Sequence, residues 1–350
     1  MGTGRDGRAP DHAPTLVPPA RGPPDPGRRN DACRPVAADG GVLAVDAPTG
    51  GAAVGPPRID HPADSLRRVI DLHTHSDRSD GSDPPGRIVD QAQDAGCAAV
   101  ALTDHDTLDG LPEARARADA RGVRLVPGCE VSCVPVAGGG VHVLVYFVDD
   151  PRSPLGTELA RLRDDRRIRN EALAARLQEL GIPVTVEAAA AHAGTAEGVG
   201  RPHFARAMVD VGAVGSLDEA FARYLGNGGE AYVPKGRLTV ADVCRLARDS
   251  GGVAVLAHPR SVGLAGGALA TAVADMAAAG LAGLDAVYGR YSPRQRTDLA
   301  NLARRFGLVA TGGSDYHGVT TPDLHVGTGT GDLKVSDRVL DQLDAARPAA

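Results

Sequence analysis

The side chains best suited to chemistry lie in one short stretch, residues 71–81, which reads DLHTHSDRSDG. His73 and His75 stand one residue apart at the end of an apolar run, and Asp80 follows in the next loop. Residues i and i+2 of a strand point to the same side, so the two imidazoles can face one cavity. Imidazole and carboxylate donors without thiolate suit zinc, manganese or iron. This stretch therefore predicts part of a metal site.

More metal-capable side chains occur on or near the ends of other predicted strands. Six of the eleven histidines take such positions, together with two acids. One histidine at a strand end is more often packed or solvated than bound to a metal, so the prediction depends on the joint pattern. In a closed βα sheet the carboxyl ends of the strands meet at one rim, where such folds build active sites. The further candidate ligands are His105, Glu130, His142, His258, Asp315 and His317.

These nine candidates are too many for a single ion with an open position, so we expect two or three metal ions. Clustered cations of this kind hold a bridging hydroxide and clamp an in-line phosphoryl displacement. Asp104 and Asp106 can be ligands as well, although Asp104, like Asp71, can instead orient a ligating histidine. His192 and His325 have no matching context, and we expect no role for them.

The elements that carry these residues alternate between strand and helix, which indicates an α/β architecture with parallel strands. A helix over 84–96 has Pro85 in its first turn and Gly96 after its end, and another over 292–307 begins at Ser292. The remaining elements are helices over 108–122, 239–251, 267–280 and 336–346, and strands over 68–76, 97–106, 123–133, 138–149, 252–259, 283–289 and 308–317.

The alternation breaks in the middle of the chain, where leucines at helical spacing indicate a small all-helical insertion. The N-terminal stretch is rich in Pro, Gly, Ala and Arg without any period, and we expect it to be disordered. The predicted organisation is a tail over 1–66, an α/β domain over 67–152 and 233–350, and the helical insertion over 153–232.

The composition argues against several classes of protein. The 350-residue chain has a net charge of −6, which disfavours binding to nucleic acid through bulk positive charge. Its five cysteines show no zinc-ribbon spacing, and we expect reduced, mostly buried thiols in a cytoplasmic protein. No run approaches the length of a transmembrane helix, and the N-terminus lacks the apolar segment of a secretory signal. We expect no membrane attachment and no stable protein partner.

Six motifs, in this order, resemble the PHP (polymerase and histidinol phosphatase) family of metal-dependent phosphoesterases. The resemblance covers roughly residues 69–346. It implies a distorted seven-stranded (β/α) barrel with a trinuclear metal site on its C-terminal rim. The motifs are DLHTHSDRSDG, ALTDHDT, PGCEVSC, VHVLVYF, AHP and GGSDYH.

Three further segments look most like one branch of this family, the nucleoside 3′,5′-bisphosphate phosphatases, 5′-to-3′ exoribonucleases and TrpH-like phosphoesterases. They read GRPHFARAMV, YVPKGRLT and VYGRYSP. The sequence departs from the branch in DAVYGRYSP, since a Glu is expected before Val287. The resemblance implies one ion held by His73, His75, Glu130 and Asp315, a second near Glu130, His142 and His105, and a third near Asp80, His105, His258 and His317.

The activity that follows is hydrolysis of a phosphate ester by a metal-bound hydroxide, which makes the protein a phosphoric ester hydrolase. We expect two or three divalent ions, with Mn favoured over Fe and Zn. The favoured substrate is the 3′-phosphate of nucleoside 3′,5′-bisphosphates, or short 5′-phosphorylated RNA. His105 and His317 are the catalytic candidates, since a histidine can protonate the leaving alkoxide. A second phosphate is expected to meet Arg201, His203 and Lys235.

Two alternatives stay open at this point. A histidinol-phosphate-type phosphatase acts on a small amine phosphate and should need an acid for the ammonium group, for which no clear candidate is present. A non-catalytic metal-binding module usually lacks some ligands, whereas this set looks complete.

Overall fold

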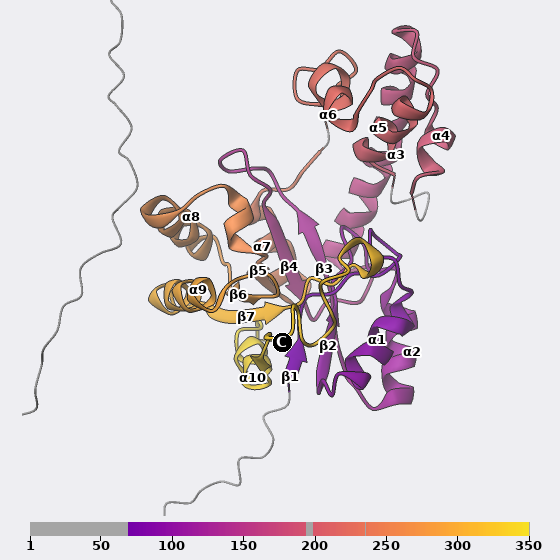
Figure 1. The fold of residues 1–350 in the computed structure, drawn as a ribbon. Helices are drawn as coiled ribbons and strands as arrows, with labels where there is room; N and C mark the ends of the chain where they lie inside the picture. The colour runs from indigo at the N-terminus through magenta and orange to yellow at the C-terminus, as the bar shows by residue number, and fades with distance from the viewer. Residues whose placement is uncertain (1–68, 194–198, 235, 350) are drawn as a thin grey trace, which may run out of the picture. The chain divides into compact units, whose positions relative to one another are not determined.

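The computed structural model describes residues 69–193, 199–234 and 236–349. The tail predicted to be disordered, residues 1–66, lies outside this part of the chain. The described part contains an eight-stranded sheet in the order β7-β6-β5-β4-β3-β2-β1-β8 (Figure 1). Its strands are β1 (Val69–Asp71), β2 (Ala99–Leu102), β3 (Arg124–Ser132), β4 (His142–Tyr146), β5 (Val253–Leu256), β6 (Gly283–Tyr288), β7 (Val309–Gly313) and β8 (Val335–Ser336).

The chain beyond β1 bonds to the chain beyond β7, so the sheet nearly closes on itself. The Asp315 N–H donates to His73 O at 2.8 Å, and the His75 N–H donates to Tyr316 O at 2.9 Å. The result is a nearly closed α/β barrel, which confirms the predicted fold class. The short strand β8 was not predicted; it pairs antiparallel with β1.

β4 runs antiparallel to both of its neighbours, β3 and β5, so the prediction of a parallel sheet is wrong here. Only residues 133–141 join β3 to β4, and a parallel crossover needs about a dozen residues or more. The reversal pairs His142, at the start of β4, with Ser132, at the end of β3. His142 therefore lies at the rim where the other strands end.

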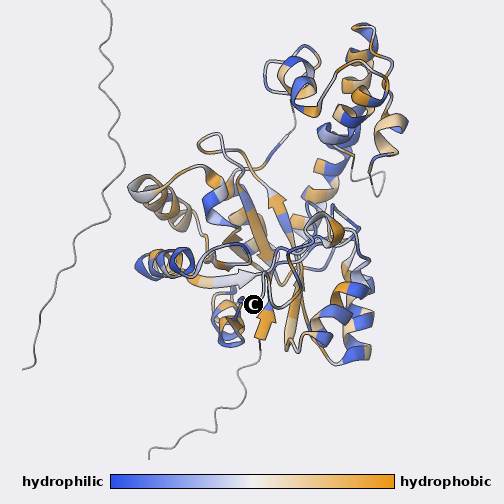
Figure 2. Ribbon diagram, in the orientation of Figure 1, coloured by the Kyte–Doolittle hydropathy of each residue, from blue (hydrophilic) through white to orange (hydrophobic). Residues whose placement is uncertain are grey.

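Apolar residues dominate most of the strands, which are largely orange in Figure 2, whereas β7 is paler. Outside the barrel, α1 buries Ile88, Val89 and Ala92, as their spacing predicted. On the opposite face of the sheet, the buried Tyr146 donates its hydroxyl to Leu72 O at 2.8 Å. The helices around the barrel are α1 (Pro85–Asp94), α2 (Leu111–Arg121), α7 (Val240–Asp249), α8 (Gly266–Ala278), α9 (Pro293–Arg305) and α10 (Arg338–Ala345).

A separate apolar cluster supports the helices that follow β4. The first half of α3 (Pro154–Glu179) packs Leu155 and Leu159 into the barrel's outer core, and its second half packs Leu173 and Leu177 against the later helices. The bounds of this helical insertion, 153–232, stay a prediction. None of the described helices is long and apolar enough to cross a membrane. The other members are α4 (Val186–Ala190), α5 (Arg201–Asp210), α6 (Leu217–Ala220) and the π-helical turn η1 (Phe221–Leu225).

Candidate metal centre

The nine predicted ligands lie in one connected group at the rim of the barrel. Seven of them follow the carboxyl ends of β1, β2, β5 and β7, whereas Glu130 lies near the end of β3 and His142 begins β4. Each has a ring nitrogen or carboxylate oxygen within 3.4 Å of another member. Side chains spread from residue 73 to residue 317 therefore meet at one place.

Glu130 is the centre of this group. Its side chain is 1% exposed, and five imidazoles surround its two oxygens. Burial opposes its ionisation, yet the charges of His105 and His73 hold its pKa well below the usual value. The carboxylate is therefore ionised and surrounded by nitrogen donors. The nearest ring nitrogens are those of His258 at 2.9 Å, His142 at 3.1 Å, His73 and His75 at 3.2 Å, and His105 at 3.4 Å.

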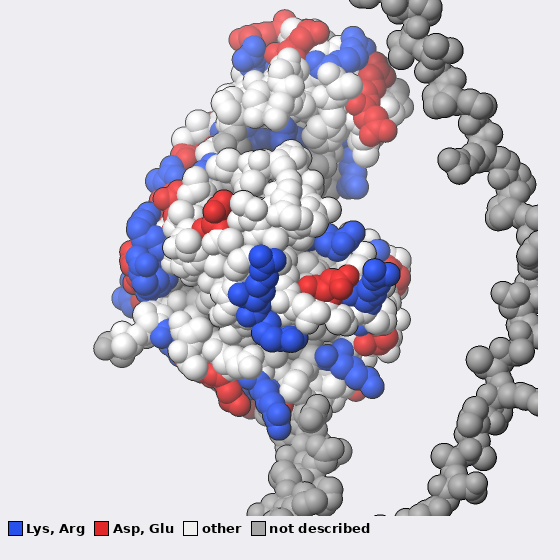
Figure 3. All heavy atoms as spheres, turned by 90° about the vertical axis from the view of Figure 1, so that its left-hand side faces the viewer, with Lys and Arg blue, Asp and Glu red and all other residues white. Residues whose placement is uncertain are grey.

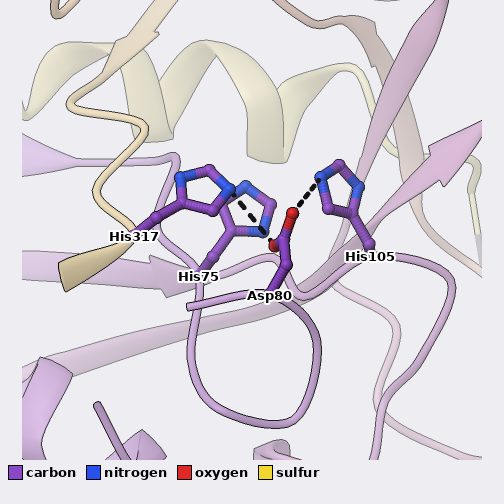
Figure 4. A group of neighbouring side chains, drawn as sticks. All are labelled: His75, Asp80, His105 and His317. Carbon is purple, nitrogen blue, oxygen red and sulfur yellow. Dashed lines mark ion pairs between the residues drawn. The ribbon is translucent and has the colours of Figure 1, made fainter. Parts of the chain in front are cut away.

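The ligand atoms fall into three groups, and within each group all atoms lie within 4.8 Å of one another. In the group drawn in Figure 4, the Asp80 carboxylate lies between the rings of His105 and His317. His258 belongs to none of the three, and lies instead beside Glu130 and His142. The groups are His75, Asp80, His105 and His317; His73, His75, Glu130 and Asp315; and His105, Glu130 and His142.

Buried nitrogens without partners show that this donor set fits metal ions. Neither ring nitrogen of the fully buried His75 makes a hydrogen bond among the described residues, although Nε2 lies 3.2 Å from oxygens of both Glu130 and Asp315. Burial lowers the pKa of His75, but the carboxylates of Asp315 and Glu130 raise it to about 10. Buried polar atoms without partners are rare in proteins unless an ion or water binds there. Glu130 belongs to two of the groups, and its two oxygens would let it serve two neighbouring ions, whereas the neutral rings of His75 and His105 would each bind one ion.

A buried acid that the sequence analysis missed orients one of the ligands. The His73 Nδ1–H donates to Asp285 Oδ2 at 3.2 Å. The same oxygen accepts a hydrogen bond from the backbone N–H of His258 at 3.3 Å. This contact leaves Nε2 of His73 as the lone-pair donor, which is the usual arrangement for a metal-bound histidine. β6 has a bulge between Asp285 and Val287. The register shift leaves Ala286 without a partner on β7, between Asp285 and Val287.

The other acids near the site hold loops in place. Asp71 accepts backbone N–H groups from the loops after β1 and β7, and Asp104 accepts bonds from two serines of the loop that carries Asp80. Asp106 accepts a hydrogen bond from the backbone N–H of Ser132 at the end of β3, and it forms an ion pair with Arg166 of α3. None of Asp71, Asp104 and Asp106 belongs to the three groups of ligand atoms.

A cavity of about 490 Å³ adjoins these groups. Its lining includes Asp80, His105 and His142 of the metal groups and His203 of α5. Arg201 lines a second cavity instead, and Lys235 lies outside the described residues. The cavity beside the metal groups also contains four arginines: Arg78, Arg163, Arg166 and Arg169.

Comparison with known proteins identifies the family. Residues 71–162 match the model of the PHP domain. The chain is 35% identical over 248 residues to the 3′,5′-nucleoside bisphosphate phosphatase of Chromobacterium violaceum, an alignment that covers 71% of this chain and 87% of that one. The chain belongs to the PHP domain family. This PHP chain is also 34% identical over 251 residues to the 5′-3′ exoribonuclease Rnm of Salmonella typhimurium, covering 71% and 85% of the two chains.

A solved structure agrees with this assignment. A metal-dependent phosphoesterase from Bifidobacterium adolescentis superposes with a TM-score of 0.64 at 29% identity, over 81% of this chain and 97% of that one. The present protein is therefore a PHP phosphoesterase, a hydrolase of phosphoric esters that depends on metal ions. Its clustered histidines and acids indicate several metal positions.

Proposed function

We propose that this PHP phosphoesterase removes the 3′-phosphate of nucleoside 3′,5′-bisphosphates or cleaves short 5′-phosphorylated RNA. The observation that carries the proposal is the convergence of the nine candidate ligands at one rim, beside a cavity lined by four arginines, of which Arg169 makes no ion pair with a described carboxylate. Guanidinium groups match the geometry of phosphate oxygens. The names of the two relatives, a nucleoside bisphosphate phosphatase and an exoribonuclease, support the same substrate class.

Two or three divalent ions, with Mn favoured, are proposed to bind the three groups of ligand atoms. When bound, such ions activate water and neutralise charge on the phosphoryl oxygens. Asp285 would hold the ring of His73 in its ligating orientation. Of the two candidate proton donors only His105 lines the cavity; because it also belongs to two groups of ligand atoms, His105 would protonate the leaving oxygen only from a ring nitrogen that binds no ion. His203 reaches the same cavity from α5 and is proposed to contact the substrate.

A side-by-side assay tests this proposal. Purified protein with Mn²⁺ is offered 3′-phosphoadenosine 5′-phosphate, a 5′-phosphorylated oligoribonucleotide and histidinol phosphate. We expect turnover of one or both nucleotide substrates and little of histidinol phosphate, because two acids of the cavity, Asp106 and Asp109, are paired with arginines. Preference for histidinol phosphate contradicts the proposal. Fewer than two ions per chain, with no activity towards any phosphate ester, favours a non-catalytic module.

A further inference from the structure

Asp80 is the most exposed of the nine candidate ligands. Its side chain is 58% exposed, and the next most exposed, that of His142, is 30% exposed. Asp80 belongs to the loop of residues 72–84, which lies between β1 and α1. Its carboxylate lies 3.2 Å from Nε2 of His317 and 3.8 Å from Nε2 of His105 (Figure 4). The position of this ligand therefore depends on the contacts that hold the loop.

The loop is anchored on both sides of Asp80. Before this residue, the buried Asp104 accepts hydrogen bonds from two serines of the loop. After it, the loop closes on itself, since the Asp77 N–H donates to the backbone oxygen of Asp83 at 2.8 Å. Asp83 thus ends the closed part of the loop, and its side chain is free to bond to another segment.

The side chain of Asp83 bonds to the segment that carries two other candidate ligands. Its Oδ2 accepts the hydroxyl of Tyr316 at 2.7 Å and the Nε2–H of Gln91, in α1, at 2.8 Å. Tyr316 stands between Asp315 and His317 in the sequence. Basic and acidic side chains are interspersed on one face of the molecule (Figure 3), but Asp83 forms no ion pair with a described arginine or lysine. Its carboxylate is held by hydrogen bonds from neutral groups instead.

The backbone around Tyr316 bonds to a further ligand and to the same loop. The His75 N–H donates to Tyr316 O at 2.9 Å, and the Ser82 N–H donates to His317 O at 3.1 Å. Tyr316 therefore contacts His75 through its backbone and the loop of Asp80 through its hydroxyl. Neither Tyr316 nor Asp83 lines the cavity beside the metal groups. The bond between their side chains can thus orient ligands without touching a molecule bound in that cavity.

We propose that Tyr316 and Asp83 are a positioning pair that sets the affinity of the metal position to which Asp80 contributes. Asp80 belongs to one group of ligand atoms only, the group drawn in Figure 4. Loss of the Tyr316 hydroxyl should therefore weaken the binding of one divalent ion and leave the others unchanged. This inference rests on the proposed function, which places ions at the three groups. It adds two residues that orient a ligand through the loop that carries it.

The test uses Tyr316→Phe, which removes one hydroxyl and keeps the ring. Isothermal titration of Mn²⁺ into the metal-free full chain measures each class of bound ion, and Asp80→Asn identifies the class that depends on Asp80. We expect the affinity of that class to fall about tenfold in Tyr316→Phe, as for other groups that orient metal ligands. The remaining ions should change less than about twofold. In the Asp80→Asn background, Tyr316→Phe should have no further effect, because both changes act on the same ion.

Tyr224→Phe is the matched control. Its hydroxyl accepts from Arg223 Nη2 at 2.8 Å in η1, and the residue belongs to no group of metal ligands. The same chemical change at this position should leave the affinity of every ion as it is in the unmodified protein. A tenfold loss in this variant as well would overturn the inference, since the effect would not depend on the contact with Asp83.

Hydrogen exchange of the metal-free protein separates positioning from general destabilisation. The amides of Asp77 and Ser82, which bond across the base of the loop and to His317 O, should exchange about tenfold faster in Tyr316→Phe. The amides of α1 and the temperature of unfolding should stay unchanged.

Three results overturn the inference. One is unchanged affinity of all ions in Tyr316→Phe, whatever the exchange rates. Another is equal weakening of every ion with a lower temperature of unfolding, which indicates a purely structural role. The third is an Asp80→Asn variant that loses no ion, since the metal position is then absent. A protein that binds ions in this way but hydrolyses no phosphate ester contradicts the proposed function alone, because neither measurement contains a substrate.

Discussion

At the scale of single residues, the metal centre is a cluster of buried and closely packed ligand groups. Glu130 is surrounded by five imidazoles, and His75 has two buried nitrogens with no hydrogen bond among the described residues. A second layer fixes these side chains: Asp285 accepts from His73, and the Tyr288 hydroxyl donates to Asp315 at 2.8 Å. Residues of this second layer should therefore affect metal affinity without touching the substrate.

Replacement of Asp285 by Asn tests this layer. The change keeps the size of the side chain but removes the charge that orients and polarises His73, so metal affinity should fall about tenfold. Isothermal titration of Mn²⁺ into the metal-free protein measures the effect. Asp298→Asn, at an exposed position of α9, is the control and should leave the affinity unchanged. Unchanged affinity in Asp285→Asn contradicts the orienting role.

The raised pKa of His75 predicts how the stability of the metal-free protein depends on pH. The folded protein holds this proton until about pH 10, whereas the unfolded chain releases it near pH 6.5. The folded state therefore binds more protons above that value, and its stability must fall as pH rises. The free energy of unfolding should decrease by about 1.4 kcal/mol per pH unit between about pH 7 and about pH 8 for each such histidine. Urea unfolding in EDTA measures it, and a rise with pH contradicts the prediction.

At the scale of elements, closure of the barrel places ligands from the two ends of the chain beside each other. The seam between β1 and β7 carries His73 and Asp315, and it requires close backbone contact at Gly313. A Cβ at Gly313 would lie 2.4 Å from both Cβ and N of His73. Because N and Cα of His73 are backbone atoms and Cβ is fixed to them, a change of side-chain rotamer cannot relieve this contact.

Gly313→Ala should therefore open the seam and weaken the metal centre together. We expect a loss of about 1–3 kcal/mol in the free energy of unfolding, as overpacking of a close contact predicts, together with reduced metal content. Gly267→Ala in α8 is the matched control, since nothing lies within 4 Å of its added Cβ; it should stabilise slightly. Denaturant unfolding and metal analysis measure both variants. Full metal content in Gly313→Ala would show that the seam does not position the ligands.

At the scale of the whole molecule, metal binding and folding are coupled. The ligands come from six strands or the loops that follow them, so a bound ion crosslinks most of the barrel. The ion pair between Arg166 of α3 and Asp106, the residue after His105, connects this helix to the metal centre as well. An ion that binds only the folded chain stabilises it by mass action, about 2.7 kcal/mol at a free concentration of 100 times Kd.

Removal of metal should therefore lower the temperature of unfolding. Calorimetry of the metal-loaded protein, with and without excess EDTA, should show a lower midpoint after chelation. The midpoint should also rise with the logarithm of added free metal. A midpoint that is independent of metal contradicts the crosslinking role of the centre. Calcium-saturated EDTA serves as the control for effects of the chelator itself.

The sequence by itself determined the types and order of the candidate ligands, because strand ends can be read from apolar runs and the histidines recur beside them. It also predicted the barrel. Tertiary structure decided what depends on contacts between distant segments: the antiparallel direction of β4, and the contact of Asp285 with His73. The pairing of arginines belongs to the same class. Arg163, Arg166 and Arg169 look alike along α3, and only the folded chain brings acids to the first two and leaves the third without one.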